Sequence, residues 1–167
     1  MKKDIIDVLS VVLFAFLINN FVFTHAKVPT SSMVPTIGVG DRLIINAAKS
    51  HYDIPERGDI VAFKLEGERL IKRCIATEGD TIHFEDGHVF VNGKRVDESE
   101  YLTSDIVTLE GHGIEYPYIV PENHIFVMGD NRVDSYDSRY FGAISVDSVW
   151  GIGAFRIYPF DKIGELE

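Results

Sequence analysis

The sequence predicts a mostly β fold, in which an antiparallel β domain follows one N-terminal transmembrane helix. Three observations predict it: an uncharged apolar run near the N-terminus, a series of short β-branched runs between turn signals, and no sustained helical period after residue 28. The chain has 167 residues, enough for one domain with its own core. We therefore expect a cytoplasmic N-terminus and membrane anchor over residues 1–27 and a β domain over residues 28–167.

The predicted anchor is the run from Val8 to Ala26, which contains no Asp, Glu, Lys or Arg. A helix of these 19 residues reaches ~28 Å, close to the thickness of the bilayer core. Lys2 and Lys3 precede the run, which favours a cytoplasmic N-terminus and an outside location for the rest of the chain. A removable signal peptide and a buried core helix are the alternatives. The acidic Asp4 and the length of the run argue against the first, and the small polar face argues against the second.

The strands are expected in seven short runs along the rest of the chain. They are residues 41–46, 59–63, 70–76, 81–84, 88–91, 124–128 and 149–157. Asp86-Gly87 and Asn92-Gly93 are strong turn signals, so the runs around them predict a meander of hairpins. Residues 97–121 show the least pattern, and we interpret them as an excursion or a long hairpin.

The composition excludes several classes of function. A formal net charge of −10 argues against a nucleic-acid partner, because phosphate contacts need clustered Lys and Arg. Cys74 is the single cysteine, which excludes an internal disulfide and a cysteine-based zinc site. The 6 histidines are scattered without a His-Glu-x-x-His pair, so we expect no metal and no cofactor.

Ser32 is the candidate nucleophile, in Val28-Pro29-Thr30-Ser31-Ser32-Met33-Val34-Pro35-Thr36. Pro29 and Pro35 bracket it, so the segment is extended or turning rather than helical. A serine hydroxyl is a weak nucleophile until a base takes its proton. Thr30 could donate its hydroxyl to an oxyanion, together with a backbone N–H. The alternative is a polar linker beside the membrane.

Lys72 is the candidate base, in a strand-like run. In a strand it shares a face with Leu70, Cys74 and Ala76, and an amine pressed into that apolar face loses hydration, so its pKa falls. Lowering a pKa of ~10.4 to ~8.5 needs roughly 2.6 kcal/mol of desolvation, which one buried site can supply. The alternative is a lysine that guards an edge strand, because Arg73 lies between apolar residues and the two faces are not cleanly separated.

A loop dense in turn formers, residues 129–142, follows the run 124–128. Its aspartates and arginines can tie it together with charge-assisted hydrogen bonds. A calcium site of the EF-hand type is excluded, because Arg132 stands where an oxygen ligand is needed and Ser135 stands where a glycine is needed. A solvated surface loop is the alternative.

Together these segments resemble the bacterial type I signal peptidase family, in a compact form like that of its Gram-positive members. Members carry Ser-Met-x-Pro-Thr behind a membrane anchor, a Gly-Asp-x-Val strand, a Lys-Arg pair followed by Gly-Asp, and a final Gly-Asp-Asn-Arg-x-x-Ser-x-Asp-Ser-Arg-x-x-Gly box. The corresponding segments here are residues 32–36, residues 58–63, Lys72-Arg73 with Gly79-Asp80, and residues 129–142. Four boxes in this order are highly specific. A lysine in place of histidine argues against the eukaryotic-type branch.

The resemblance implies a serine endopeptidase with a Ser-Lys dyad that removes signal peptides from secreted preproteins. Ser32 would attack the scissile carbonyl, and neutral Lys72 would take the serine proton and later protonate the leaving amine. The Ser32 N–H and the Thr30 hydroxyl would form the oxyanion hole, and Ser135 would hold the Lys72 amine. The implied braces of the loop are Asp130, Arg132, Asp137 and Arg139. The implied walls of pockets for small side chains are Val28, Met33, Ile71 and Ala62.

The resemblance also implies a single-pass protein of the cell membrane, with the N-terminus cytoplasmic and the catalytic β domain outside. The expected partners are preproteins that carry signal peptides, the lipid bilayer and a secretion translocon, with no nucleic acid. The substrate would bind in an extended form, as an added strand. One rival is a self-cleaving repressor of similar β fold, which carries a DNA-binding domain in place of an anchor. The other is an anchored β domain that only binds a partner, which a serine-directed acylating inhibitor would leave unlabelled.

Overall fold

The computed structural model describes residues 6–11, 23–103 and 106–166. Residues 6–11 are helical, and among the described residues no helix has the length and hydrophobicity that crossing a bilayer requires. Most of the predicted anchor, residues 12–22, lies outside the described residues.

The predicted end of the anchor helix at Ala26 is wrong, because β1 (Phe23–Lys27) is a strand. Its backbone pairs antiparallel with β2 (Arg42–Asn46), from Phe23 opposite Asn46 to Lys27 opposite Arg42. The ladder satisfies the backbone polar groups of these residues in place of helical hydrogen bonds. The β structure therefore begins at Phe23, before the expected boundary at residue 28.

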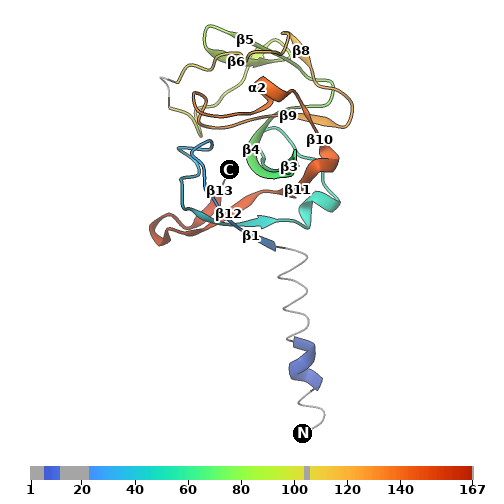
Figure 1. The fold of residues 1–167 in the computed structure, drawn as a ribbon, viewed down its shortest axis with the longest axis vertical. Helices are drawn as coiled ribbons and strands as arrows, with labels where there is room; N and C mark the ends of the chain where they lie inside the picture. The colour runs from blue at the N-terminus through green and yellow to red at the C-terminus, as the bar shows by residue number, and fades with distance from the viewer. Residues whose placement is uncertain (1–5, 12–22, 104–105, 167) are drawn as a thin grey trace.

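Three antiparallel sheets build the rest of the molecule (Figure 1). Their strand orders are β1-β2-β12-β13, β10-β9-β4-β3-β11 and β7-β6-β5-β8. The remaining strands are β3 (Ile60–Leu65), β4 (Glu68–Thr77), β5 (Thr81–Glu85), β6 (His88–Val91), β7 (Lys94–Arg95), β8 (Tyr118–Ile119), β9 (His124–Met128), β10 (Ile144–Ser145), β11 (Val149–Ile152), β12 (Ala154–Tyr158) and β13 (Gly164–Leu166). The short helices are α2 (Ser138–Phe141), η1 (Lys49–His51), η2 (Val146–Ser148) and η3 (Phe160–Lys162). The prediction of a mostly antiparallel β domain is confirmed.

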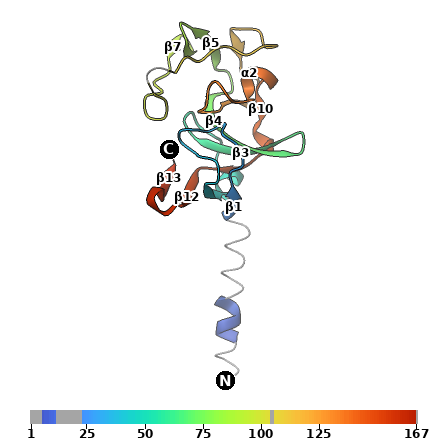
Figure 2. The same cartoon turned by 60° about the vertical axis from the view of Figure 1, so that its left-hand side comes forward.

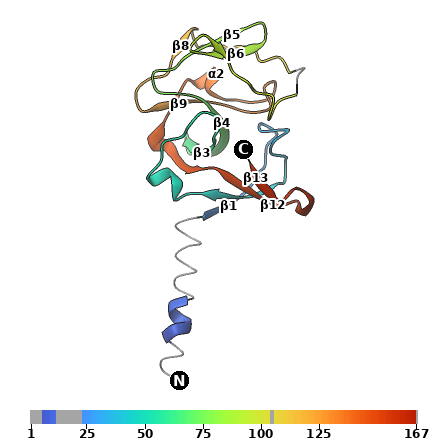
Figure 3. The same cartoon turned by 180° about the vertical axis from the view of Figure 1, so that it is seen from behind.

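The sheets are layered along the long axis of the domain. In three views, β1 lies at one end, β5 lies at the opposite end, and β3 and β4 lie between them (Figures 1, 2 and 3). The middle sheet therefore holds the central position. Its strand β4 pairs with β3 on one side and with β9 on the other.

The turn signals place the hairpins as expected. β5 pairs with β6 around Asp86-Gly87, and β6 pairs with β7 around Asn92-Gly93. All four turn residues have positive φ, between 48° and 78°, which Asn, Asp and Gly tolerate best. In the region 97–121, β8 is the regular element, and it returns to pair with β5. The region is therefore an excursion between β7 and β8.

The single strand predicted over residues 149–157 is wrong. Gly153 has a φ of 81° and divides the run into β11 and β12. β11 pairs with β3 in the middle sheet, whereas β12 pairs with β2 in the first sheet. The glycine turns the chain from one sheet to the next, which a residue with a Cβ would do only under strain.

Candidate active site

Ser32 lies in a series of tight turns between β1 and β2. The Val34 N–H donates to the Ser31 carbonyl at 3.0 Å, and the Ile37 N–H donates to the Met33 carbonyl at 2.8 Å. Met33 and Ile37 are buried in the hydrophobic cluster that also holds core residues of β2 and β3. The apolar residues of the turn therefore fix it to the core and leave Ser32 partly exposed.

The structure brings Lys72 to Ser32. The Lys72 Nζ atom donates a hydrogen bond to Ser32 Oγ at 2.5 Å, across 40 residues of sequence. Lys72 lies on β4 opposite Val61, and it is 3% exposed. Lys72, the candidate base, is thus held on the central strand of the middle sheet, and Ser32, the candidate nucleophile, is held on the turn that contacts it.

Burial lowers the pKa of Lys72 from 10.5 to about 8. Desolvation is the largest cause, because it disfavours the charged amine. The negative charges of Asp137 and Asp130 raise the pKa in opposition, and the positive charge of Arg139 lowers it further. A substantial fraction of the amine is therefore neutral in mildly alkaline solution, the form in which it can accept a proton.

The surroundings of Lys72 differ from the predicted face in one respect. Leu70 and Cys74 pack in one hydrophobic cluster, as a regular strand predicts, but Ala76 packs in another, together with Ile75. A register shift in the pairing with β9 between Cys74 and Ala76 interrupts the alternation. The edge-strand interpretation of Lys72 is wrong, because β4 has a paired strand on each side.

The loop 129–142 holds the backbone of the nucleophile turn. The Asn131 N–H donates to the Ser32 carbonyl at 3.0 Å, and Asn131 Nδ2 donates to the Ser31 carbonyl at 3.2 Å. Ser31 Oγ in turn donates to Asp134 Oδ2 at 2.8 Å. Ser31 and Ser32 are therefore fixed by both the main chain and the side chains of this loop.

Gly129 allows the loop to approach this closely. A Cβ at this position would lie 2.3 Å from the Ser32 carbonyl oxygen and 2.2 Å from Ser135 Oγ, distances that real Cβ atoms do not show. The absence of a side chain is required here for contact and not for a left-handed backbone.

Ser135 lies next to this contact, but it does not bind Lys72 in this structure. Its Oγ atom is buried and has no hydrogen-bond partner among the described residues. Lys72 Nζ bonds instead to Ser32. Both Ser135 Oγ and the Ser32 carbonyl oxygen lie next to the position that a Cβ of residue 129 would occupy.

Ion pairs brace the loop, and two of them reach outside it. Asp137 pairs with Arg139 within the loop at 2.9 Å and accepts the Gly129 N–H at 2.9 Å. The Asp130 carboxylate accepts two hydrogen bonds from Arg73, from Nε at 3.0 Å and from Nη2 at 2.8 Å. Asp130 and Asp137 are 0% exposed, so the surface-loop interpretation is wrong.

Sequence reasoning missed two of these partners, Arg73 and Glu98. Arg73 is 1% exposed, and its place inside an apolar run is the signal that it needs a buried acid. Glu98 pairs with Arg132 from the excursion 97–121, and nothing in its local pattern marks it.

A cavity of about 610 Å³ opens beside the dyad. Ser32, Lys72 and Thr30 lie on its wall, and so do three of the predicted pocket residues, Val28, Met33 and Ile71. The other lining residues are His25, Ala26, Lys27, Pro29, Ile37, Gly67, Glu68, Arg69, Leu70 and Trp150. Ala62 does not line this cavity; it is 1% exposed and packs in the same core cluster as Val28 and Met33.

Comparisons with known proteins find relatives that match most of the chain. The family model for signal peptidase, peptidase S26, matches residues 2–158. The chain is 35% identical over 174 residues to Signal peptidase I S of Bacillus subtilis, covering 97% of this chain and 94% of that protein. It is 36% identical over 168 residues to Signal peptidase I of Leptolyngbya laminosa, covering 95% and 79%. The crystal structure of a signal peptidase I from Enterococcus faecalis is similar with a TM-score of 0.51 and 32% identity, covering 60% of this chain and 97% of that chain.

Proposed function

The chain belongs to the signal peptidase (peptidase S26) family, and we propose that it is a membrane-anchored serine endopeptidase whose Ser32–Lys72 dyad removes signal peptides from secreted preproteins. Family membership makes the chain a peptidase. The observation that carries the proposed mechanism is the 2.5 Å contact from Lys72 Nζ to Ser32 Oγ at the wall of an open cavity.

Neutral Lys72 accepts the proton of Ser32 Oγ, which attacks the scissile carbonyl. The burial that lowers the pKa of Lys72 to about 8 supplies the neutral amine. When the tetrahedral intermediate collapses, Lys72 returns the proton to the leaving amine, and the signal peptide remains as an ester of Ser32. A water then attacks this ester while Lys72 takes its proton, and the released Ser32 hydroxyl regains a proton from Lys72.

The proposed oxyanion hole consists of the Ser32 N–H and the Thr30 hydroxyl. Thr30 is exposed on the cavity wall two residues before Ser32, where a bound carbonyl could reach it. Such donors act best when they are already in place before charge develops. We assign Ser135 the role of a second partner for the Lys72 amine once Ser32 is acylated, because its buried hydroxyl is otherwise unsatisfied.

The substrate lies extended in the cavity, and alternate side chains point into walls made by Val28, Met33 and Ile71. Val28 and Met33 are fixed in the core, in one cluster with Ala62, so the pockets admit small residues and exclude aromatic ones by overpacking. We propose that alanine is preferred at the first and third positions before the cleaved bond.

The proposed topology places Lys2 and Lys3 in the cytoplasm and the β domain outside, with the anchor before β1, which begins at Phe23. Ser32 follows the apolar run closely, so the dyad works at the outer surface of the bilayer, where a cleavage site emerges. Protease added outside intact cells should then degrade the β domain and spare the N-terminus.

The decisive experiment measures cleavage of a preprotein by the full chain in detergent. Ser32→Ala and Lys72→Ala should each lower the rate by at least ~10²-fold, because the two groups act as one unit. Lys64→Ala, an exposed lysine of the neighbouring strand β3, is the matched control and should retain activity. If Lys72→Ala kept more than about a tenth of the rate, Lys72 would not be the general base. A serine-directed acylating inhibitor should label Ser32, whereas a module that only binds a partner would remain unlabelled.

A further inference from the structure

We propose that Glu98 and Tyr101, on the excursion between β7 and β8, are positioning residues that hold the nucleophile turn through the two buried arginines Arg73 and Arg132. The inference rests on the proposed Ser32–Lys72 dyad and extends it to a segment that carries none of the family boxes. The contacts on which it depends form an unbroken chain from this segment to Ser32.

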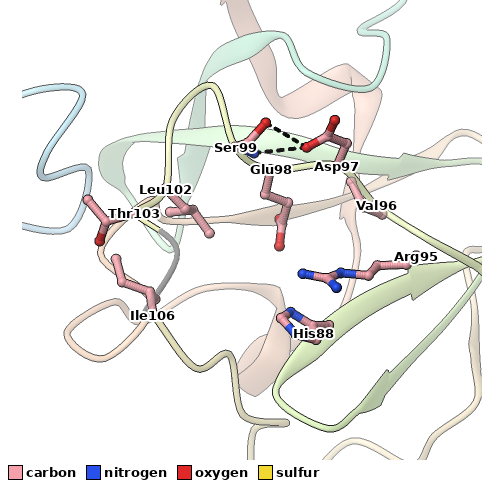
Figure 4. Close-up of a pocket in the computed structure, with 9 residues that line it drawn as sticks. All are labelled: His88, Arg95, Val96, Asp97, Glu98, Ser99, Leu102, Thr103 and Ile106. Carbon is pink, nitrogen blue, oxygen red and sulfur yellow. Dashed lines mark hydrogen bonds between the residues drawn. The ribbon is translucent and has the colours of Figure 1, made fainter.

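The first link is the geometry of the segment itself. Ser99 donates its N–H and its hydroxyl to Asp97 Oδ1, at 3.1 and 2.7 Å, which closes a tight turn beside Glu98 (Figure 4). The Tyr101 and Leu102 N–H groups then donate to the Glu98 carbonyl at 3.2 and 2.9 Å. These bonds place Tyr101 one helical turn after Glu98, and the Tyr101 hydroxyl donates to Glu98 Oε1 at 3.1 Å.

The second link joins this pair of side chains to Arg132. Both oxygens of Glu98 accept from Arg132, and the contact to Oε2 measures 3.1 Å. Thr108 Oγ1 accepts from the same guanidinium at 2.9 Å. The side chain of Arg132 is 0% exposed and that of Glu98 is 11% exposed, so this is an almost fully buried ion pair. Burial alone would lower the pKa of Arg132, but the hydrogen bonds to Glu98 and its charge raise the pKa above its usual value.

The third link joins the same tyrosine to Arg73. The Arg73 guanidinium carbon lies 4.0 Å from the centre of the Tyr101 ring, and that of Arg132 lies 5.9 Å from it. Tyr101 therefore lies within cation–π distance of both arginines that brace the loop 129–142. Burial, followed by the neighbouring charge of Glu98, raises the pKa of Tyr101, so its hydroxyl remains a donor.

The last link reaches the nucleophile. Arg132 Nε donates to the Gly129 carbonyl at 3.1 Å, and Arg73 binds Asp130 in a bidentate pair. A Cβ at Gly129 would lie 2.3 Å from the Ser32 carbonyl oxygen, so the two backbones pass close to each other, and the Asn131 N–H donates to the same carbonyl. The position of the backbone of residues 129–131 therefore determines where Ser32 lies relative to Lys72.

Removing one partner of a buried ion pair leaves the other charge unsatisfied, so Arg132 would move when Glu98 is neutralised. A shift of the order of 1 Å at a reacting atom can cost about 10²-fold in rate. Glu98→Gln should therefore lower kcat by about ten- to a hundredfold and leave KM unchanged, because Glu98 is not on the wall of the substrate cavity. Tyr101→Phe keeps the ring over Arg73 and removes one hydrogen bond, so its effect should be in the same direction and smaller.

The experiment measures preprotein cleavage by the full chain in detergent, with kcat expressed per Ser32 labelled by an acylating inhibitor. This normalisation removes any loss of folded protein, which a purely structural role would cause. Glu100→Gln, an exposed carboxylate in the same segment, is the matched control and should behave as the wild type. The ascending limb of the pH profile should not move, because Glu98 acts on the nucleophile and not on the base.

Lower kcat per labelled serine in Glu98→Gln, with unchanged KM and an unmoved pH profile, supports the proposal. Wild-type kcat per labelled serine in both Glu98→Gln and Tyr101→Phe overturns it, and so does a change confined to KM. If Glu98→Gln yields no folded protein, Tyr101→Phe alone decides. None of these outcomes affects the proposed dyad, which fails only if Ser32→Ala or Lys72→Ala remains active.

Discussion

Replacing Lys72 with methionine is expected to abolish cleavage and to stabilise the folded protein. The two side chains have similar length, but methionine carries no charge into a site that is 3% exposed. The folded state lowers the pKa of Lys72 from 10.5 to about 8, so it disfavours the protonated amine. Below about pH 8 this cost is present in full, and it disappears as the pH rises towards the unfolded pKa.

The magnitude follows from the two pKa values. At ~1.4 kcal/mol for each pH unit, the full cost of the charged amine is about 3 kcal/mol near pH 6. It falls to about 1.5 kcal/mol near pH 9.5, where most of the folded protein already holds a neutral amine. Loss of the hydrogen bond to Ser32 subtracts about 1 kcal/mol at either pH. The free energy of unfolding of Lys72→Met should therefore exceed that of the wild type by about 2 kcal/mol near pH 6 and by about 0.5 kcal/mol near pH 9.5.

Urea unfolding of the full chain in mild detergent at the two pH values measures this difference. Lys64→Met, at an exposed position of β3, is the control, and its difference from the wild type should not change with pH. The other titrating groups are common to the wild type and the variant, so their contributions cancel. If the Lys72→Met variant gained the same stability over the wild type at both pH values, or gained less near pH 6 than near pH 9.5, the buried, desolvated lysine would be refuted.

Three further predictions concern activity. The cleavage rate should rise with pH through an apparent pKa near 8, since only neutral Lys72 is a base, and a profile that is flat from about pH 6 to 10 would contradict this. Thr30→Val should lower kcat by about 10²-fold while Thr30→Ser stays close to the wild type; equal rates for valine and threonine would remove Thr30 from the oxyanion hole. Gly129→Ala should lose nearly all activity in the same preprotein assay, because its Cβ would lie 2.3 Å from the Ser32 carbonyl oxygen. Gly164→Ala, with no atom within 4 Å, is the control, and an active Gly129→Ala enzyme would show that the loop can retreat without moving Ser32.

The features that the sequence could predict are local ones. Asp-Gly and Asn-Gly dipeptides favour a particular turn, so the hairpins around residues 86–87 and 92–93 follow from a few residues each. Ser32 and Lys72 are marked by their neighbours, a bracket of prolines and an apolar strand. Gly153 also carried a local signal, because a glycine inside a strand run indicates a bend or bulge.

The features that could not be predicted depend on distant pairing. Arg73 pairs with Asp130 across 57 residues of sequence, and Arg132 pairs with Glu98 across 34. The periodicity of the sequence does not indicate which acidic residue pairs with which arginine. The register shift after Cys74 is likewise decided by the pairing of β4 with β9. Local pattern and the family resemblance led to the prediction of the Ser32–Lys72 dyad, whereas long-range contacts determine how these two residues are held.

The hairpin that joins β3 to β4 limits the insertions and deletions that this part of the chain can accept. Its two central residues, Glu66 and Gly67, have φ of 50° and 89°, and they place Leu65 opposite Glu68 and Val61 opposite Lys72. Lys72 and Arg73 are consecutive, so moving β4 by one residue would exchange the faces they occupy. An arginine never loses its proton under ordinary conditions, so it could not replace Lys72 as the proposed base. Insertions and deletions are usually tolerated at exposed hairpin tips, but at this one the proposed dyad requires a turn of fixed length.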